Sequence, residues 1–354
     1  SIKDYEKYSY YLGTGNSHSI LVNRISYILN LRGPSEAIDT ACSSALVAIH
    51  RAIQSIQSNE SDLAIAGGVN ALISSSSFIS CFEAGMLSQD GRCKTFDKTA
   101  NGYVRGEGVG AIVLKRLSQA QADGDHIYGI IKSSAVNHGG HVNTLTAPNP
   151  NAQAELIKLA CHKAGITPDT ISYIETHGTG TALGDPIEIN GLKKAFSDLA
   201  QEHHQSLKEQ YCGLGSIKTN IGHCEAAAGI AGVIKTLLSM THQEIPANLH
   251  CHELNPYIKL AGSPFYIVTK KQAWERLKDG NREIARRAGV SSFGFGGSNA
   301  HVILEEAPLR VKVNDHKPYY LVTLSAKTEE SYQQKQAELL TWLQEADEGE
   351  ALSS

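Results

Sequence analysis

The sequence has few aromatic residues and no long hydrophobic run. Phenylalanine, tryptophan and tyrosine make up 6% of its 354 residues, whereas hydrophobic residues make up 41% and glycine occurs 32 times. This composition argues against an aromatic-rich β-sandwich and favours closely packed, alternating strands and helices. No apolar run approaches the roughly 20 residues of a membrane span. No signal-peptide pattern opens the chain either.

Charge and cysteine usage exclude further classes. The formal net charge is −4 and there is no basic block, so we expect no nucleic-acid partner. The net charge does not exclude an acidic substrate that is bound at a local site. The seven cysteines are scattered without a C-x-x-C pair, which favours reduced thiols in a cytoplasmic protein. The chain begins at Ser1 rather than methionine and ends in the polar "EADEGEALSS". We therefore expect a piece of a longer polypeptide.

Apolar runs of strand length alternate with helical patterns from about residue 37 to residue 306. Buried strands are expected within residues 62–72, 109–117, 127–136, 171–178 and 211–219. Helices are expected within residues 45–56, 154–161 and 226–238, and the last of them is apolar on nearly all sides. The alternation predicts an α/β protein with helices packed on a largely buried sheet.

Two segments share one plan, "IDTACSSALVAIHRAIQSI" and "IKTNIGHCEAAAGIAGVIKTLL". Each has a strand end, a turn of small residues with a reactive side chain, and a long apolar helix. A duplicated unit would produce this similarity, and so would chance. Past Pro308 the sequence becomes polar. We expect a main domain over residues 1–308 and a flanking segment over residues 309–354, with one strand and one amphipathic helix capped at Thr328.

Cys42 precedes the helix that is expected to begin at Ser43 or Ser44. Unpaired amides at a helix N-terminus favour the thiolate, which is the nucleophilic form of cysteine. A small, buried core residue is the alternative, because free cysteine is among the most buried residue types. The cysteine alone does not decide between these two interpretations.

A second segment, "ETHGTGTALGDPIE", places His177 directly after a strand and before a glycine-rich loop. Its glycine spacing is not G-x-G-x-x-G, so a dinucleotide site is not expected. A histidine at the carboxyl end of a buried strand is where α/β proteins place site residues. The alternative is a structural histidine that satisfies loop carbonyls.

The segment "SIKTNIGHCEAAAGIAG" crowds Lys218, His223 and Glu225 into a turn before a helix of alanine and glycine. We expect this helix to pack closely on another backbone. Lys218 and Glu225 are expected to form a buried ion pair, since either charge alone would be costly there. A helix N-terminus would keep His223 neutral, which suits a hydrogen-bond donor in catalysis.

In "SSFGFGGSNAHVILEEAP", the "GFGG" stretch gives backbone amides close access to a ligand. We expect Phe295 to gate an apolar channel and Phe293 to pack in the core. There is no G-x-S-x-G elbow and no phosphate-binding loop. His250, Cys251 and His252 are adjacent and would point apart, so no metal site is expected there. A thiol, two histidines, a lysine and a glycine loop at strand ends favour acyl-thioester chemistry.

One known family carries these motifs in this order: "DTACSSALVAIH", "ETHGTGTALGDPIE", "KTNIGHCEAAAG" and "SSFGFGGSNAHVILEE". Over about residues 10–308 the chain resembles the β-ketoacyl synthase (ketosynthase) domain of a modular polyketide synthase. The segment "GTGNSHSILVNRISYILNLRGPSEAIDTACSS" is similar to the trans-acyltransferase type, whose modules lack their own acyltransferase. The resemblance implies a thiolase-like fold of two similar βαβαβαββ halves, layered α-β-α-β-α, and a homodimer. Only 41 residues precede Cys42, so we expect the N-terminal half to lack its leading strands in this chain.

The resemblance also implies the chemistry. Cys42 would carry the growing acyl chain as a thioester, and His177 and His223 would stabilise the enolate formed by decarboxylation of a malonyl group. Related ketosynthases that only transfer or dock chains typically lack the histidine of the "HGTGT" loop. Because His177 is present, we expect a chain-elongating enzyme.

Four further residues have supporting roles by the same resemblance. Lys218 would order the histidines through Glu225, and Asn299 would lie behind the reacting groups. The backbone amides of Cys42 and Phe295 would form an oxyanion hole. The domain itself would bind no metal and no cofactor, because phosphopantetheine is supplied by the partner acyl carrier protein. Neighbouring polyketide synthase domains are the other expected partners.

Two relatives of the same fold fit less well. A thiolase would carry a second cysteine near the C-terminal glycine loop, and that loop reads "GFGGSN". A chain-length factor, which is a structural partner, would lack the cysteine that this chain has at position 42. A non-elongating ketosynthase stays the main alternative.

Overall fold

The computed structural model describes residues 11–308 and 321–345. The chain divides into two compact units, residues 1–307 and 308–354, and the first holds every predicted site residue. The predicted boundary at residue 309 falls outside the described ranges and stays a prediction. Among the described residues, no helix has both the length and the apolar character needed to cross a membrane.

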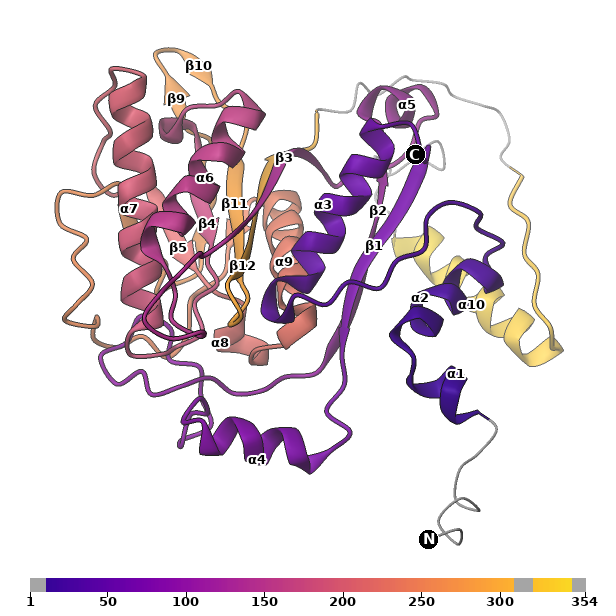
Figure 1. The fold of residues 1–354 in the computed structure, drawn as a ribbon. Helices are drawn as coiled ribbons and strands as arrows, with labels where there is room; N and C mark the ends of the chain where they lie inside the picture. The colour runs from indigo at the N-terminus through magenta and orange to yellow at the C-terminus, as the bar shows by residue number, and fades with distance from the viewer. Residues whose placement is uncertain (1–10, 309–320, 346–354) are drawn as a thin grey trace, which may run out of the picture. The chain divides into compact units, whose positions relative to one another are not determined.

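A six-stranded sheet forms the centre of the first unit (Figure 1). In sheet order its strands are β3 (Gly129–His138), β12 (Ser298–Glu306), β11 (Arg287–Phe293), β4 (Tyr173–Glu175), β5 (Cys212–Gly215) and β7 (Phe265–Ile267). β11, β4, β5 and β7 are parallel, whereas β12 is antiparallel to β11 and β3. The predicted strands at 127–136, 171–178 and 211–219 are thus confirmed. The motifs that follow β4, β5 and β11 meet at one edge of the sheet, where α/β proteins place their sites.

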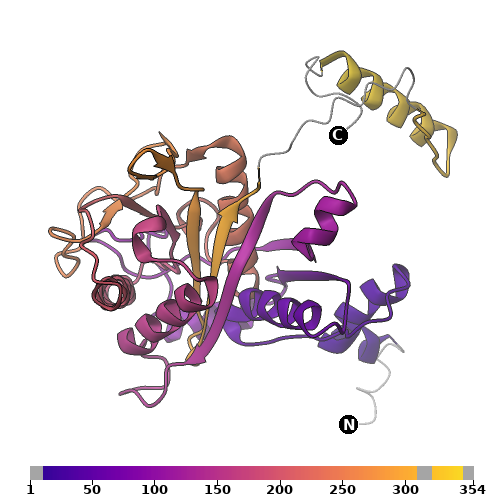
Figure 2. The ribbon, with the colours of Figure 1, turned by 90° about the horizontal axis from the view of Figure 1, so that it is seen from above.

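Helices cover both faces of this sheet (Figures 1 and 2). Leu156 and Phe196 are buried on one side, and Leu46 and Val233 on the other. A Cβ at Gly229 would lie 3.1 Å from the backbone nitrogen of Leu46, so the predicted close packing of the third helix on another backbone is confirmed. The helices are α6 (Pro150–Ala164) and α7 (Gly184–Glu202) on the first side, and α3 (Ser44–Gln57) and α9 (Ala228–His242) on the second.

β1 (Leu63–Asn70) and β2 (Gly108–Lys115) form a separate antiparallel pair. Both strands were predicted, but the expectation that they are buried is wrong. One face packs on α3 and α9, whereas the alternate side chains on the other face are exposed, among them Val109 at 83% and Val113 at 64%. The reason is that no described element covers this second face.

Short elements connect these parts. They are α1 (Leu12–Asn16), α2 (His18–Ile28), α4 (Ser75–Glu83), α5 (Leu117–Ala122), α8 (Lys218–Ile221), β6 (Glu244–Ile245), β8 (Gln272–Ala273), β9 (Lys278–Asp279) and β10 (Arg282–Glu283). Short 3₁₀ turns lie at Ala41–Ser43, Pro168–Thr170 and Glu225–Ala227. The first and third of these turns lead directly into α3 and α9. The two sequence segments therefore share the backbone of the turn and the helix. The strand end that was predicted before Cys42 is not found, because residues 34–40 have no regular structure.

The second unit contains α10 (Glu329–Glu345). Its predicted cap is confirmed, because Thr328 Oγ1 accepts a hydrogen bond from the Ser331 N–H at 3.2 Å. The predicted strand is not found over residues 321–326, which have no regular structure. Its first residues lie outside the described ranges.

Candidate active site

The turn at Cys42 places its thiol at the start of α3, as predicted. Ala41 is left-handed (φ 55°), a conformation that residues other than glycine disfavour. Short side chains hold it there. Asp39 Oδ1 accepts from the Ala41 N–H at 3.0 Å, and Ser44 Oγ donates to the Ala41 carbonyl at 2.6 Å. The strained residue directly before the cysteine makes the turn sharp and leaves Cys42 partly exposed.

The glycine loop after β11 packs directly on this turn. A Cβ at Gly294 would lie 2.5 Å from the Thr40 carbonyl oxygen, so no larger residue fits without a shift of the backbone. The close approach brings the Phe295 amide to the thiol of Cys42. The Phe295 ring is 55% exposed, whereas Phe293 is buried and contacts His177, with ring centroids 5.6 Å apart. The core-packing prediction for Phe293 is confirmed.

Two carboxylates on the first turns of α7 hold the loop that carries His177. Glu188 accepts from the N–H groups of His177 and Gly178 at 2.7 and 2.8 Å. Asp185 accepts from the N–H groups of Gly180 and Phe96 at 3.1 and 2.8 Å. Burial raises the pKa of Asp185 to about 6 and of Glu188 to about 7, although the amide donors oppose it. Neither residue was predicted from the sequence. The pattern that could have indicated them is a pair of acidic residues in the first turns of a helix that follows a glycine-rich loop.

The contacts of the His177 ring do not fit a purely structural role. Its buried Nδ1 has no hydrogen-bond partner, and within the described residues the ring bonds no loop carbonyl. The alternative of a histidine that satisfies loop carbonyls is therefore wrong. The ring lies edge-to-face against His223, with centroids 5.5 Å apart. Burial, and then the charge of Lys218, hold the pKa of His177 well below its usual range, so the imidazole is neutral.

His223 is neutral too, and its tautomer is set by the backbone. Burial lowers its pKa well below the usual range, with further contributions from the charges of Lys218 and Arg105. The direction matches the prediction, but burial rather than a helix N-terminus is the main cause. Nδ1 accepts from the Glu225 N–H at 3.0 Å, so the single proton of the neutral ring lies on Nε2. His223 is thus a hydrogen-bond donor through Nε2.

The predicted ion pair between Lys218 and Glu225 is wrong. Glu225 instead pairs with Arg105, whose Nε and Nη2 donate to the two carboxylate oxygens at 2.5 and 2.9 Å. Lys218 is 3% exposed, and its ammonium has no ion-pair partner within the described part of the chain. Burial lowers the pKa of Lys218, and the charges of Glu175 and Glu188 oppose this shift.

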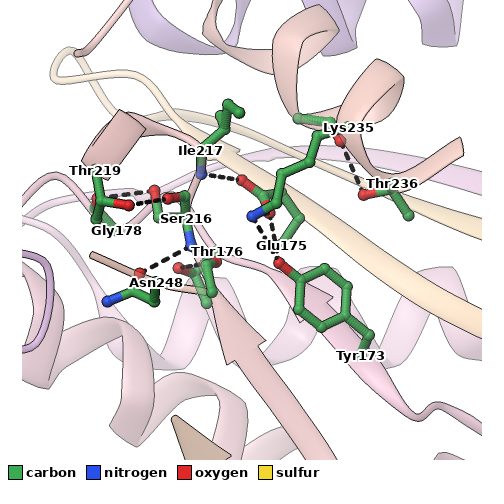
Figure 3. A network of polar contacts seen from close by, with 12 residues as sticks. Tyr173, Glu175, Thr176, Gly178, Ser216, Ile217, Thr219, Lys235, Thr236 and Asn248 are labelled. Carbon is green, nitrogen blue, oxygen red and sulfur yellow. Dashed lines mark hydrogen bonds and ion pairs between the residues drawn. The ribbon is translucent and has the colours of Figure 1, made fainter. Parts of the chain in front are cut away.

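A buried network anchors the backbone just before Lys218 (Figure 3). Glu175 Oε2 accepts from Lys235 Nζ and from the Tyr173 hydroxyl, both at 2.7 Å. Glu175 Oε1 accepts from the Ile217 N–H at 2.6 Å. This carboxylate thereby joins β4, α9 and the start of α8. This network was not predicted from the sequence, although a single lysine on an otherwise apolar helix indicates a buried partner of opposite charge.

The resting thiol of Cys42 is not acidic. Although the residue as a whole is partly exposed, its thiol is largely enclosed by protein, and this burial raises its pKa to about 11 against the opposing effects of the Lys218 charge and the amides of Phe295 and Cys42. The prediction that the helix N-terminus favours the thiolate is wrong for this site, because burial dominates. The thiol therefore has to lose its proton as it reacts.

Three predicted residues come together at this edge of the sheet. The Cys42 sulfur and one ring nitrogen each of His177 and His223 lie within 4.8 Å of one another, the only such potential metal-ligand group among the described residues. The tautomer of His223 disfavours a metal here. Binding through Nε2 would move the proton to Nδ1, where it would face the Glu225 N–H. Asn299 is buried on β12 opposite Phe293, and its amide donates to Asn137 Oδ1 at 3.2 Å.

Family models match the chain in succession. The β-ketoacyl synthase N-terminal domain matches residues 2–120, its C-terminal domain residues 128–252, and the ketoacyl-synthetase C-terminal extension residues 255–354. The polyketide synthase PksN of Bacillus subtilis is 57% identical over 291 residues, which are 82% of this chain and 5% of that protein. PksM of the same organism is 53% identical over 331 residues, which are 93% of this chain and 8% of that protein. The chain thus spans less than a tenth of these relatives.

Solved structures resemble the chain over most of its length. The ketosynthase from module 6 of the bacillaene synthase of Bacillus subtilis is 45% identical, with a TM-score of 0.84, over 94% of this chain and 57% of that one. An oxazolomycin ketosynthase domain of Streptomyces albus is 42% identical, with a TM-score of 0.88, over 95% and 57%. These matches confirm the predicted thiolase-like fold. The chain belongs to the β-ketoacyl synthase family of acyl-transferring enzymes, as a ketosynthase of the polyketide synthases.

Proposed function

We propose that this ketosynthase elongates a polyketide chain by decarboxylative Claisen condensation of a Cys42-bound acyl group with a malonyl group. One observation carries the proposal: the Cys42 thiol lies within 4.8 Å of two imidazole nitrogens, and both imidazoles are neutral. Acyl transfer alone needs the thiol and an oxyanion hole. Two neutral hydrogen-bond donors suit the second step, in which negative charge develops on a thioester oxygen.

In the first step, Cys42 attacks the thioester of the incoming chain. The sulfur–carbonyl bond to the carrier breaks, and the thiol proton leaves with the departing carrier thiolate. The amides of Cys42 and Phe295 both interact with the sulfur, which supports their proposed role in stabilising the tetrahedral oxyanion. Such preorganised donors contribute roughly 3–4 kcal/mol each. The product is an acyl chain on Cys42.

In the second step, a malonyl thioester loses carbon dioxide, and the electron pair of the broken bond forms an enolate. The Nε2–H of His223, together with His177, stabilises the enolate oxygen. Lys218 adds a positive charge near both histidines. The enolate carbon then attacks the acyl carbonyl on Cys42 and displaces its sulfur, so the chain on the carrier grows by two carbons.

The partners follow from this chemistry. Acyl carrier protein domains deliver the acyl and malonyl groups on their phosphopantetheine arms, so the domain needs no cofactor of its own. The sequence resemblance supports assignment to the trans-acyltransferase type, in which a separate acyltransferase loads the malonyl group. Phe295, an exposed residue whose backbone amide interacts with the thiol, is the proposed gate between the two steps. A homodimer flanked by other polyketide synthase domains is the proposed assembly.

Intact-mass measurement on the full-length protein separates the two steps. With an acyl thioester, Cys42→Ala should abolish acylation, whereas Cys251→Ala, which removes another partly exposed thiol, should not change it. His177→Ala should still be acylated but should lose elongation with malonyl carrier protein. His162→Ala, which removes an exposed imidazole, should elongate normally.

The same measurement tests the alternative of a non-elongating ketosynthase. If the unmodified protein is acylated but its chain never grows with malonyl carrier protein, the domain only transfers or docks chains. If His177→Ala and Cys42→Ala lose acylation equally, the proposed division of roles between the two residues is wrong.

A further inference from the structure

Arg105 lies beside His223, although no sequence motif pointed to it. It belongs to the loop between α4 and β2, and its backbone forms a parallel bridge with His223. The His223 N–H donates to the Val104 carbonyl at 2.7 Å, and the Gly106 N–H donates to the His223 carbonyl at 2.9 Å. The backbone of His223 is therefore fixed by the residues on either side of Arg105.

The side chain of Arg105 binds three partners at once. Its Nε and Nη2 hold both carboxylate oxygens of Glu225, and its Nη1 donates to Ser77 Oγ at 2.6 Å. The guanidinium also lies 4.7 Å from the ring centroid of Phe78. Only 6% of the Arg105 side chain is exposed. A buried, bidentate guanidinium constrains both the position and the plane of the carboxylate that it binds.

Glu225 needs such a constraint because its backbone is left-handed, with φ at 44°. In this conformation its N–H donates to His223 Nδ1. If Glu225 relaxed to a right-handed or extended conformation, this N–H would turn away from the ring. Nδ1 would then be free to carry the imidazole proton, and Nε2 would become an acceptor.

We propose that Arg105 is a positioning residue: it holds Glu225 in the left-handed conformation and thereby keeps the proton of His223 on Nε2. This inference rests on the proposed function, in which that proton faces the developing enolate. Arg105 does not touch the reacting groups in this scheme. It acts on decarboxylation and elongation, and leaves acylation of Cys42 unchanged.

Rate measurements on the full-length protein test the first half of the inference. Arg105→Met should lower malonyl decarboxylation and elongation about tenfold, since the strain it releases is of that order. Acylation of Cys42 should stay at the wild-type rate. Ser77→Ala, which removes only the contact to α4, should elongate normally. Glu225→Gly added to Arg105→Met should restore most of the rate, because glycine adopts the left-handed conformation without strain.

Ring-nitrogen NMR of histidine-labelled protein tests the second half without reference to activity. The His223 signals, assigned by their loss in His223→Gln, should show a proton on Nε2 in the wild type, a mixture in Arg105→Met, and Nε2 again in the double variant. An unchanged tautomer in Arg105→Met overturns the positioning role, whatever the rate. A mixed tautomer with unchanged elongation supports the positioning role and instead refutes the proposed function of His223.

Discussion

Two turns of the same backbone shape open the helices α3 and α9, and only one of them carries a cysteine, the proposed nucleophile. A left-handed residue, Ala41 or Glu225, starts each 3₁₀ turn. The next residue is partly exposed in both turns, and the four residues after it are buried in both. That next residue is Cys42 in the first turn and Ala226 in the second. The turns therefore differ in their chemistry and not in their shape.

The two turns are also held in different ways. The first is held locally, by Asp39 and Ser44, and the glycine loop packs on it at Gly294. The second is held by Arg105, which lies 120 residues away from Glu225 in the sequence. A local turn of this kind exposes a side chain to substrate. The second turn instead directs a backbone N–H at His223, the proposed enolate-stabilising histidine, and it depends on a distant part of the chain to do so.

The comparison continues along the two helices. With Ala41 aligned on Glu225, Arg51 of α3 corresponds to Lys235 of α9. Arg51 pairs with Glu36 and Glu60 at the surface, and 35% of its side chain is exposed. Lys235 pairs with Glu175 in the interior, and 5% of its side chain is exposed. Equivalent positions of the two helices thus carry one exposed and one buried ion pair.

Lys235→Met should therefore have the largest effect on stability. It leaves the Glu175 carboxylate charged and buried without its partner, which costs about 3–5 kcal/mol of the free energy of unfolding. Arg51→Met is the matched control, and its change should be small because water solvates the carboxylates that it leaves behind. Denaturant unfolding followed by circular dichroism measures both. Equal losses for the two variants would show that the environment of the pair does not matter.

Gly294→Ala should displace the loop that packs on the first turn, at Cys42, and should leave the second turn, at Glu225, unchanged. The added Cβ meets the backbone oxygens of Thr40 and Ser298 at 2.5 and 3.0 Å, so the loop must move and take the Phe295 amide from Cys42. If this amide is a donor of the proposed oxyanion hole, its loss lowers the rate about a hundredfold or more. Acylation of Cys42, followed by intact mass, measures this.

Gly296→Ala is the matched control for this loop. A Cβ there has no atom within 4 Å, and the residue is not left-handed, so acylation should proceed at the wild-type rate. If both alanine variants are acylated equally fast, the close approach at Gly294 does not position the amide.

The same comparison explains how much the sequence could predict. Cys42, His177 and His223 were identifiable because each follows a recognisable local pattern. The meeting of His177 and His223 followed from the parallel strands β4 and β5, whose carboxyl ends share one edge, whereas no described strand precedes Cys42. The fold class was predictable for the same reason, since alternation of strands and helices is a local property.

What the sequence did not predict depends on segments that are distant in the chain. Lys218 and Glu225 are seven residues apart, and a nearby partner was the natural inference for both. Glu225 instead meets Arg105, because the loop before β2 runs beside His223. The exposed face of β1 and β2 likewise depends on which elements cover it, and periodicity does not encode that. The pKa of Cys42 was mispredicted because it depends on burial by separate segments.

The last prediction concerns this pKa, because it tests whether a helix start alone activates a thiol. With the pKa of Cys42 raised to about 11, its thiolate fraction should rise about tenfold per pH unit between pH 8 and pH 10. Iodoacetamide alkylation at Cys42, quantified by peptide mass spectrometry, should follow the same slope. A free thiol levels off above its ordinary pKa of about 8.5. Lys218→Met should slow alkylation most at pH 8, because the lysine charge lowers the thiol pKa and the lowered pKa of Lys218 removes that charge toward pH 10. A plateau near pH 9 in the wild type would mean that the helix start lowers the thiol pKa by more than burial raises it. A cysteine in place of Ala226 in the second turn would then be expected to react in the same way.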